Sequence, residues 1–334
     1  MKAPILSVIM SVHNDERFVS EAIASVLGSS FAGLEFLVTD DGSTDGTPAI
    51  LSQFNDERLT VIQHSKNQGL TSSLIGAIAQ SRGRYIARMD SDDVSLPSRF
   101  ERQVAFLEEH PDYGLVGCRY VLIDEEGHDL TKIDLPEANV EINAQLLSTN
   151  PFCHGATMFR RSVIDEVGSY RREFRYAQDY DLWLRITERF NAHNLPDYLY
   201  KWRLRLGSIA VGQRHKQKAF GQLSRACAVQ RRSGLPESDL DAQASEIMRT
   251  EGGKSLWRWL RPVDRYDLLI TRVLLEKGDS AQARRRLGAR LQTRPYSPVT
   301  YLLLGATFIP ATVVRTVSRW LAARLSARSG GSGR

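Results

Sequence analysis

Short apolar runs alternate with segments of helical periodicity along residues 1–123 of the chain. The apolar runs predict buried strands at Ile5–Val12, Leu34–Val38, Leu59–Gln63, Tyr85–Met89 and Leu115–Ile123. Apolar residues spaced by three and four positions predict helices at 16–28, Thr47–Phe54 and Leu70–Gln80, and another that Pro97 opens. Strands that alternate with helices predict an α/β fold, in which helices cover both faces of a mostly parallel sheet.

The pattern changes in the second half of the chain. Residues 128–178 are less regular, and a helix is then predicted at Asp179–Phe190. From residue 200 the chain becomes basic and helical, with a predicted hairpin of two helices at Tyr266–Lys277 and Ser280–Leu291. We therefore expect a first domain at 1–205, a basic helical region at 206–328 and a flexible tail at 329–334.

The distribution of charge separates these two regions. The net charge of the 334 residues is +5. Residues 1–199 hold 18 Lys and Arg against 30 Asp and Glu, a net of −12, whereas residues 200–334 hold 26 against 9, a net of +17. An acidic region that binds an anionic nucleotide requires a cation as mediator. A basic region suggests phosphate partners, either anionic lipid headgroups or nucleic acid.

The spacing of the three cysteines gives no support for a zinc site or a disulfide framework. Cys118, Cys153 and Cys227 are widely spaced, and no CxxC motif or Cys/His cluster accompanies them. Neither a zinc site nor a disulfide framework is indicated, which agrees with a reducing cytoplasm. No signal peptide with a cleavage site is visible near Met1, so we expect a cytoplasmic protein.

Two acidic motifs follow predicted strands. Asp40-Asp41-Gly42-Ser43 comes after the second strand, and Asp90-Ser91-Asp92-Asp93 after the fourth. Ligands of open α/β sheets bind beyond the carboxyl ends of the strands, so both motifs are expected at one site. Asp90-Ser91-Asp92-Asp93 is consistent with a solvated acidic turn, but the repulsion among three carboxylates favours a bound Mg²⁺ or Mn²⁺. Asp40-Asp41 is consistent with a hydrogen-bonded turn or with contacts to a base or ribose.

The order of several short motifs resembles that of family-2 glycosyltransferases with the GT-A fold. The motifs are Ser7–Asn14, Asp40–Asp45, Asn67-Gln68-Gly69, Gly83–Asp93 and Gln178–Arg185. The resemblance spans about residues 4–205. It implies a Rossmann-like mixed sheet and transfer of a sugar from a nucleotide-sugar donor.

The resemblance also implies roles for single residues. Residues Ser11, His13 and Asn14 would line the nucleotide, Asp41 with Asp40 would meet the base, Asp92 with Asp90 would hold the metal, and Asp179 would be the catalytic base. Asn67 and Gln178, in two of the motifs, are expected to contact substrate, and His154, outside them, could contact acceptor or diphosphate. The family often has Pro and Tyr at the positions of Ser11 and His13, and usually Glu at that of Gln178. These departures affect contacts to base and acceptor rather than the reaction.

Several of these residues have a structural alternative. Asp179 is suited to accept the proton of an attacking hydroxyl, but it could instead cap a helix. His154 could be a hydrogen-bonded structural histidine. Trp183 is expected in the core, and Arg203 and Arg205 are expected on the solvated surface.

The basic region raises the question of a membrane. Val299–Val314 holds 16 residues without a charge, fewer than the ~20 that span a bilayer. Apolar residues between Val313 and Leu321 form one helical arc, which favours an interfacial amphipathic helix over a helix packed on the protein. We therefore expect a peripheral protein on the anionic inner face of the cell membrane.

The leading hypothesis is an inverting, metal-dependent transferase that uses a UDP-sugar and a glycan or lipid-linked glycan acceptor. A nucleotidyltransferase-like enzyme and a non-catalytic nucleotide-sugar-binding module are the alternatives. No GxGxxG motif or P-loop is present, which argues against nicotinamide and kinase chemistry. No aromatic-interleaved basic motif supports nucleic-acid binding.

Overall fold

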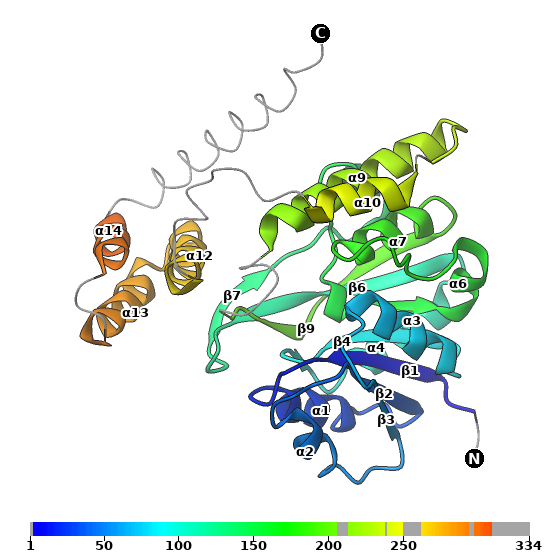
Figure 1. Cartoon of the computed structure of the whole chain (residues 1–334), viewed down its shortest axis with the longest axis horizontal. Coiled ribbons are helices and arrows are strands. Elements are labelled where there is room, and N and C mark those ends of the chain that lie inside the picture. The colour runs from blue at the N-terminus through cyan, green and yellow to red at the C-terminus, as the bar shows by residue number, and fades with distance from the viewer. Residues whose placement is uncertain (1–2, 206–212, 238, 250–261, 294–296, 309–334) are drawn as a thin grey trace. The chain divides into compact units, whose positions relative to one another are not determined.

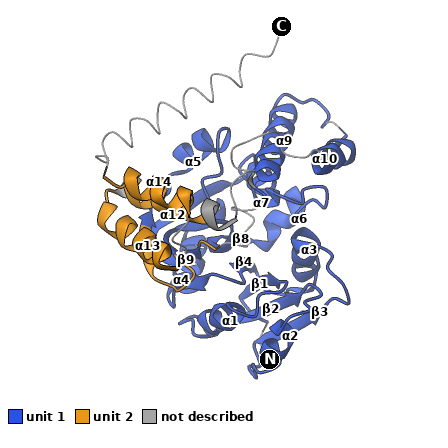
Figure 2. Cartoon of the chain, turned by 60° about the vertical axis from the view of Figure 1, so that its left-hand side comes forward, with its two compact units in different colours: residues 1–123, 132–203, 213–252 blue, residues 124–131, 204–212, 253–334 orange. Residues whose placement is uncertain are grey.

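The computed structural model describes residues 3–205, 213–237, 239–249, 262–293 and 297–308 (Figure 1). The chain divides into two compact units (Figure 2). Unit 1 comprises residues 1–123, 132–203 and 213–252, and unit 2 comprises residues 124–131, 204–212 and 253–334. The predicted domain boundary at 205 adjoins residues 206–212, which lie outside the described residues.

Unit 1 is built on one mixed sheet. Its strand order is β3 (Leu59–Gln63), β2 (Leu34–Asp40), β1 (Leu6–Val12), β4 (Tyr85–Asp90), β8 (Met158–Arg160), β6 (Tyr113–Ile123), β9 (Asn191–Arg203) and β5 (Val94–Ser95), and β7 (Asp129–Ile133) pairs with β6 off this path. Strands β1 to β4 are parallel, as are β6 and β9. β8 runs antiparallel to both β4 and β6, and joins the two parallel parts. The predicted α/β fold with a mostly parallel sheet is confirmed.

Helices cover both faces of this sheet. They are α1 (Val19–Leu27), α2 (Thr47–Leu51), α3 (Leu70–Gln80), α4 (Arg99–Glu109), α5 (Asn139–Leu146), α6 (Arg161–Val167), α7 (Gln178–Ile186), α9 (Arg214–Arg232) and α10 (Leu240–Arg249), with a short 3₁₀ turn η1 (His154–Ala156). The alternation of β1 separates two cores. Val8 packs with residues of α1 and α4, whereas Ile9 packs with residues of α3 and α7.

The predicted elements of residues 1–123 are confirmed, with ends that shift by a few residues. The helix predicted at Asp179–Phe190 is shorter, because α7 ends at Ile186. β9 was not predicted. Its sequence contains Pro196 and Asp197 and does not alternate cleanly between polar and apolar residues, so the strand is hard to recognise. In the structure its pairing with β6 is correspondingly irregular between Cys118 and Tyr120.

Unit 2 contains three described helices, α12 (Pro262–Lys277), α13 (Ser280–Thr293) and α14 (Pro298–Ala306). α12 and α13 form the predicted hairpin around Gly278, whose φ of 86° suits glycine. In the described part of the chain no helix is both long enough and apolar enough to span a membrane. The amphipathic arc predicted at Val313–Leu321 and the tail at 329–334 lie outside the described residues.

Candidate functional site

Polar residues meet at the carboxyl ends of three neighbouring strands. β1 lies between β2 and β4, and its register pairs Ser11 with Asp90 and Val12 with Asp40. Ser11 and Asp40 are buried, and the side chain of Asp90 is 28 % exposed. The parallel register therefore brings both acidic motifs to one edge of the sheet, although 50 residues separate Asp40 from Asp90.

The loop after β1 is joined to the loop after β2. Asn14 has a positive φ of 51°, and its N–H donates to Ser43 Oγ at 3.0 Å. Its Oδ1 accepts from the Thr44 N–H at 2.7 Å. His13 is exposed beside it, with Nε2 3.3 Å from Asn14 Nδ2. Asp40 Oδ1 accepts from the Ser43 N–H at 3.0 Å. The carboxylate at the end of β2 therefore forms the hydrogen-bonded turn that the sequence suggested.

Asp41 organises the loop that follows β3. Its Oδ1 accepts from the Gln68 N–H at 2.9 Å and lies 2.8 Å from His64 Nδ1, while its Oδ2 accepts from the Gly69 N–H at 2.8 Å. Burial raises the pKa of this carboxyl, but these hydrogen bonds outweigh burial and hold the pKa below its usual value. Asn67 lies exposed in the same loop. The motif Asp40–Asp45 and the motif Asn67-Gln68-Gly69 are therefore joined by the hydrogen bonds of Asp41.

Asp90 is held in place by its neighbours. Arg88, which is buried, donates Nη2–H to Asp90 Oδ1 at 2.6 Å. The Asp90 N–H donates to the Tyr200 hydroxyl at 3.2 Å. A Cβ at Gly155 would lie 2.7 Å from Asp90 Oδ2, so only glycine lets the backbone of η1 approach this carboxylate. One oxygen of Asp90 is thus fixed by Arg88, and the second faces η1.

The rest of this motif corrects one expectation. Arg203 is 2 % exposed rather than solvated, and it lies beneath the turn. Its backbone N–H donates to Asp93 Oδ1 at 2.7 Å, and its Nε–H donates to the Asp92 carbonyl at 2.7 Å. Burial and the charges of Asp92 and Asp90 raise the pKa of Asp93. A fully solvated acidic turn is therefore wrong for Asp93, which stands at the base of the turn.

The carboxylates of Asp90 and Asp92 suit a hard divalent cation. Mg²⁺ and Mn²⁺ prefer oxygen ligands, and Mg²⁺ often takes one or two carboxylates together with substrate phosphates. Among the described residues, no three His, Cys, Asp or Glu side chains gather their ligand atoms within 4.8 Å at this motif.

His154 occupies the turn that faces Asp90. Its Nε2 lies 2.9 Å from the Tyr170 hydroxyl, and its ring contacts that of Trp183 edge-on. Burial lowers the pKa of His154, while the charges of Asp179 and Asp90 act in the opposite direction. Trp183 is fully buried, as predicted. His154 thus makes the hydrogen bond of a structural histidine and also stands among the acidic groups of the site.

Asp179 lies in the first turn of α7. The residue before the helix, Ala177, has a left-handed backbone with φ of 53° and makes no side-chain cap, so Asp179 is not the capping residue. Asn150 donates Nδ2–H to Asp179 Oδ2 at 2.7 Å. Gln178 beside it is buried. Asp179 is partly exposed and lines a pocket of about 440 Å³.

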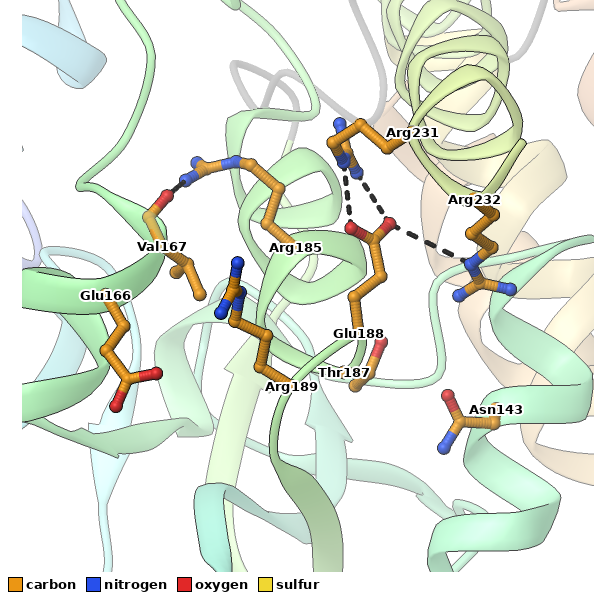
Figure 3. Close-up of a pocket in the computed structure, with 9 residues that line it drawn as sticks. All are labelled: Asn143, Glu166, Val167, Arg185, Thr187, Glu188, Arg189, Arg231 and Arg232. Carbon is orange, nitrogen blue, oxygen red and sulfur yellow. Dashed lines mark hydrogen bonds and ion pairs between the residues drawn. The ribbon is translucent and has the colours of Figure 1, made fainter. Parts of the chain in front are cut away.

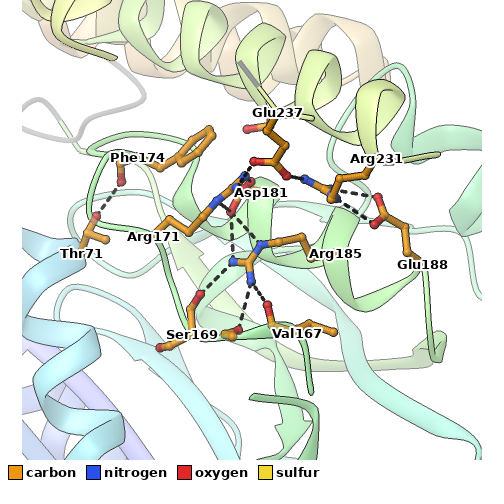
Figure 4. Close-up of polar contacts among 12 residues, drawn as sticks. Thr71, Val167, Ser169, Arg171, Phe174, Asp181, Arg185, Glu188, Arg231 and Glu237 are labelled. Atoms are coloured by element: carbon orange, nitrogen blue, oxygen red, sulfur yellow. Dashed lines mark hydrogen bonds and ion pairs between the residues drawn. The ribbon is translucent and has the colours of Figure 1, made fainter. Parts of the chain in front are cut away.

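A buried ionic network anchors this helix (Figure 4). Asp181 is completely buried, and it accepts from Arg171 Nε–H at 3.0 Å and from Arg185 Nε–H at 3.1 Å. Arg185 also donates to the carbonyl groups of residues 167, 168 and 169. Glu237, which precedes α10, pairs with Arg171 and with Arg231 of α9. Sequence reasoning missed this network, because its members are spread over residues 167–237.

The larger pocket of unit 1, of about 840 Å³, lies at the opposite end of α7 (Figure 3). It contains neither Asp179 nor the acidic motifs. Arg231 donates to Glu188 at 2.9 Å, and Arg232 Nε lies 3.8 Å from the same carboxylate. Three of its charged residues, Glu188, Arg231 and Arg232, pair with one another. We place the candidate site at the pocket of Asp179 and at the sheet edge, because these hold the residues that the sequence singles out.

The sequence is similar to that of known glycosyltransferases. The family model described as Glycosyl transferase family 2 matches residues 7–168. The putative glycosyltransferase EpsE of Bacillus subtilis is 37 % identical over 254 residues, which cover 74 % of this chain and 89 % of that protein. The amylovoran biosynthesis glycosyltransferase AmsE of Erwinia amylovora is 33 % identical over 215 residues, with 63 % and 79 % covered.

Solved structures show the same fold. The mannosyltransferase PcManGT from Pyrobaculum calidifontis, in complex with GDP-Man and Mn²⁺, has a TM-score of 0.54 over 94 % of this chain and 87 % of that one, at 18 % identity. Residues 1–349 of S. aureus TarS, in complex with UDP-GlcNAc, have a TM-score of 0.58 over 94 % and 91 %, also at 18 % identity. The fold is of the GT-A type.

Proposed function

Since this chain belongs to glycosyl transferase family 2, we propose that it is an inverting, metal-dependent enzyme that uses a UDP-sugar donor. Membership of the family makes the chain a glycosyltransferase. The acceptor that we propose is a hydroxyl group of a glycan or lipid-linked glycan. The strand register supports this proposal, because it pairs Val12 with Asp40 and Ser11 with Asp90 and so brings both acidic strand ends to one edge of the sheet.

Residues at this edge are assigned to the donor. Ser11, His13 and Asn14 would line the nucleotide, and Asp41, with Asp40 beside it, would meet the base. Asp41 also accepts hydrogen bonds from the loop after β3, and it would thereby hold Asn67 at the site. The complex of TarS with UDP-GlcNAc supports a nucleotide-sugar donor.

Asp92 would be the principal metal ligand and Asp90 the supporting one. A bound Mg²⁺ or Mn²⁺ would stabilise the negative charge of the departing diphosphate. The Mn²⁺ in the complex of PcManGT supports this assignment. Arg88 holds the carboxylate of Asp90, and Arg203 holds the backbone of Asp92, so the protein would keep the turn in place before the cation binds.

Asp179 is assigned as the general base. It would take the proton of the acceptor hydroxyl as that oxygen bonds to the anomeric carbon and the bond to the diphosphate breaks. Asn150 orients one carboxylate oxygen and leaves the other for the proton. Gln178 and His154 would border the acceptor. The name of AmsE, an amylovoran biosynthesis enzyme, supports a glycan acceptor.

The proposal is tested with Asp179→Asn, which keeps the hydrogen bond from Asn150 but cannot accept the proton. We expect sugar transfer and UDP-sugar hydrolysis to fall at least about a hundredfold, while UDP and Mn²⁺ still raise the unfolding temperature. Asp165→Asn, at an exposed position, is the control. Transfer at a near-normal rate in Asp179→Asn would reject the assigned base.

The same assay separates the alternatives. A nucleotidyltransferase-like enzyme would release pyrophosphate from a nucleoside triphosphate, whereas a sugar transferase releases UDP. A binding module would be stabilised by UDP-sugars with Mn²⁺ but would release no UDP. A panel of UDP-, GDP- and dTDP-sugars identifies the donor in the same experiment.

A further inference from the structure

The pocket beside Asp179 has a second wall, formed by helix α9. Ser148, Thr149 and Asn150 line it on one side, Ala177, Asp179 and Tyr180 of the α7 region on another, and Gln217, Lys218, Gly221 and Arg225 of α9 on the third. All of these residues belong to unit 1. Any acceptor that reaches Asp179 through this pocket therefore passes the side chains of α9.

Two cations of this wall have no carboxylate partner among the described residues. Lys218 makes no ion pair there, and the contacts of Arg225 are to uncharged groups, namely the Ser148 carbonyl at 3.1 Å and the side chain of Tyr180. The arginines on the other side of α7 differ in this respect. Arg171, Arg185 and Arg231 each pair with a carboxylate (Figure 4). Lys218 and Arg225 thus retain donors that can serve a ligand.

The two cations lie on one face of the helix. Lys218 and Arg225 are seven residues apart, which corresponds to two turns and about 10 Å along the axis. Among the described residues, Asp179 is the only carboxylate that lines the pocket, and it is assigned to the proton of the acceptor. The pocket therefore has a net positive charge beside its base. A neutral sugar would leave both cations without an ionic partner.

We propose that Lys218 and Arg225 form an anion subsite, which holds a phosphate or carboxylate group on the acceptor while its hydroxyl meets Asp179. This inference rests on the proposed function, because it assigns the acceptor to the pocket of the base. Guanidinium and ammonium groups both bind oxyanions through charge-assisted hydrogen bonds. The enzyme would thereby select acidic acceptors over neutral ones.

The test is titration calorimetry of the full chain, saturated with UDP and Mg²⁺ so that the donor site is filled. The probes are glucose 1-phosphate, methyl β-D-glucuronide and neutral methyl β-D-glucoside. We expect at least one acidic sugar to bind about tenfold or more tightly than the glucoside, since one lost charge-assisted bond corresponds to such a factor. The preferred probe tells whether the group is a phosphate or a sugar carboxylate.

Variants connect this preference to the two cations. Lys218→Gln and Arg225→Gln should each weaken binding of the acidic sugar several-fold, and the double variant should abolish the preference. Arg189→Gln, which removes an exposed cation at the other pocket, should leave it unchanged. Equal binding of acidic and neutral sugars, or a preference that survives in the double variant, would overturn the inference.

Binding of UDP with Mg²⁺ is measured on the same samples. If the double variant weakens UDP binding, the two cations serve the donor and the anion subsite is rejected. If the wild type neither binds UDP with Mg²⁺ nor hydrolyses UDP-sugars, the proposed function itself fails, whatever the sugar probes show.

Discussion

At the scale of single residues, close backbone approaches shape the candidate donor site. Gly42 has a φ of 72°, and a Cβ there would lie 2.6 Å from the backbone carbon of Lys66 and 2.7 Å from the nitrogen of Asn67. Glycine is therefore needed for conformation and for space. Together with the hydrogen bonds of Asp41, this contact holds the loop that contains Asn67 against the end of β2.

Gly42→Ala should destabilise the protein more than Gly69→Ala. Both positions have a positive φ, so both substitutions introduce backbone strain of about 1–2 kcal/mol. A Cβ at Gly69 meets nothing within 4 Å, whereas one at Gly42 collides with backbone. Urea unfolding measures the difference, and UDP binding should weaken only in Gly42→Ala. Equal destabilisation by both substitutions would show that the close approach does not matter.

Asp41→Asn should lower stability in a pH-dependent way. The folded pKa of Asp41 lies below the usual value of 3.8, so the carboxylate stabilises the fold above about that pH, and this contribution disappears as the pH falls through the folded pKa. We expect a loss of about 1–3 kcal/mol at neutral pH, which shrinks in acid. Urea unfolding across this pH range, with Glu57→Gln at an exposed site as the control, checks both the size and the sign.

At the scale of elements, α7 is the helix on which the proposed chemistry depends. Its first turn holds Asp179, and its interior holds Asp181 between Arg171 and Arg185. Through Arg171 and Glu237, the network extends to the segment between α9 and α10. The position of Asp179 therefore depends on contacts that its own helix cannot provide.

Asp181→Ala should lower the free energy of unfolding by about 3–5 kcal/mol, because it leaves the buried Arg185 without its carboxylate partner and removes one of the two carboxylates of Arg171. It should also reduce transfer, since α7 loses its anchor. Arg249→Ala breaks an exposed pair with Glu246 and should cost less than about 1 kcal/mol. Thermal and urea unfolding compare the two variants, and a similar cost for both would contradict the anchoring role.

At the scale of the whole molecule, charge is divided along the chain. Residues 1–199 have a net charge of −12 and residues 200–334 a net charge of +17. Basic residues near an anionic lipid surface contribute about 1 kcal/mol each, and salt screens them. We propose that the basic region holds the enzyme peripherally at the inner face of the cell membrane, where a lipid-linked acceptor would be found.

The full chain should therefore sediment with vesicles that contain phosphatidylserine, and high salt should release it. Vesicles of phosphatidylcholine alone are the control, because they share the bilayer and lack the negative charge. Recovery of the protein in the supernatant with both kinds of vesicle would reject membrane attachment through charge.

Much of the fold was predictable, because local patterns specify the elements of residues 1–123. Both acidic motifs were predictable as one site, since parallel strands end at the same edge of a sheet. β9 and β8 were not, because polar residues interrupt the alternation in β9 and because β8 has only three residues, too few to show a pattern. Arg203 looked like a surface residue for a similar reason, since its sequence neighbours do not reveal that it lies under the turn of Asp92 and Asp93.

The sequence by itself determined the alternation of strands and helices, the two acidic turns and Asp179 at the start of a helix. Only the tertiary structure decided which distant residues surround them. Arg171 and Arg225 contact Asp181 and Tyr180 of α7 from other segments, and Glu237 joins them through Arg171. These contacts exist only after the chain has packed. Periodicity records which side of an element faces the core, but it does not record which residues of other elements lie opposite.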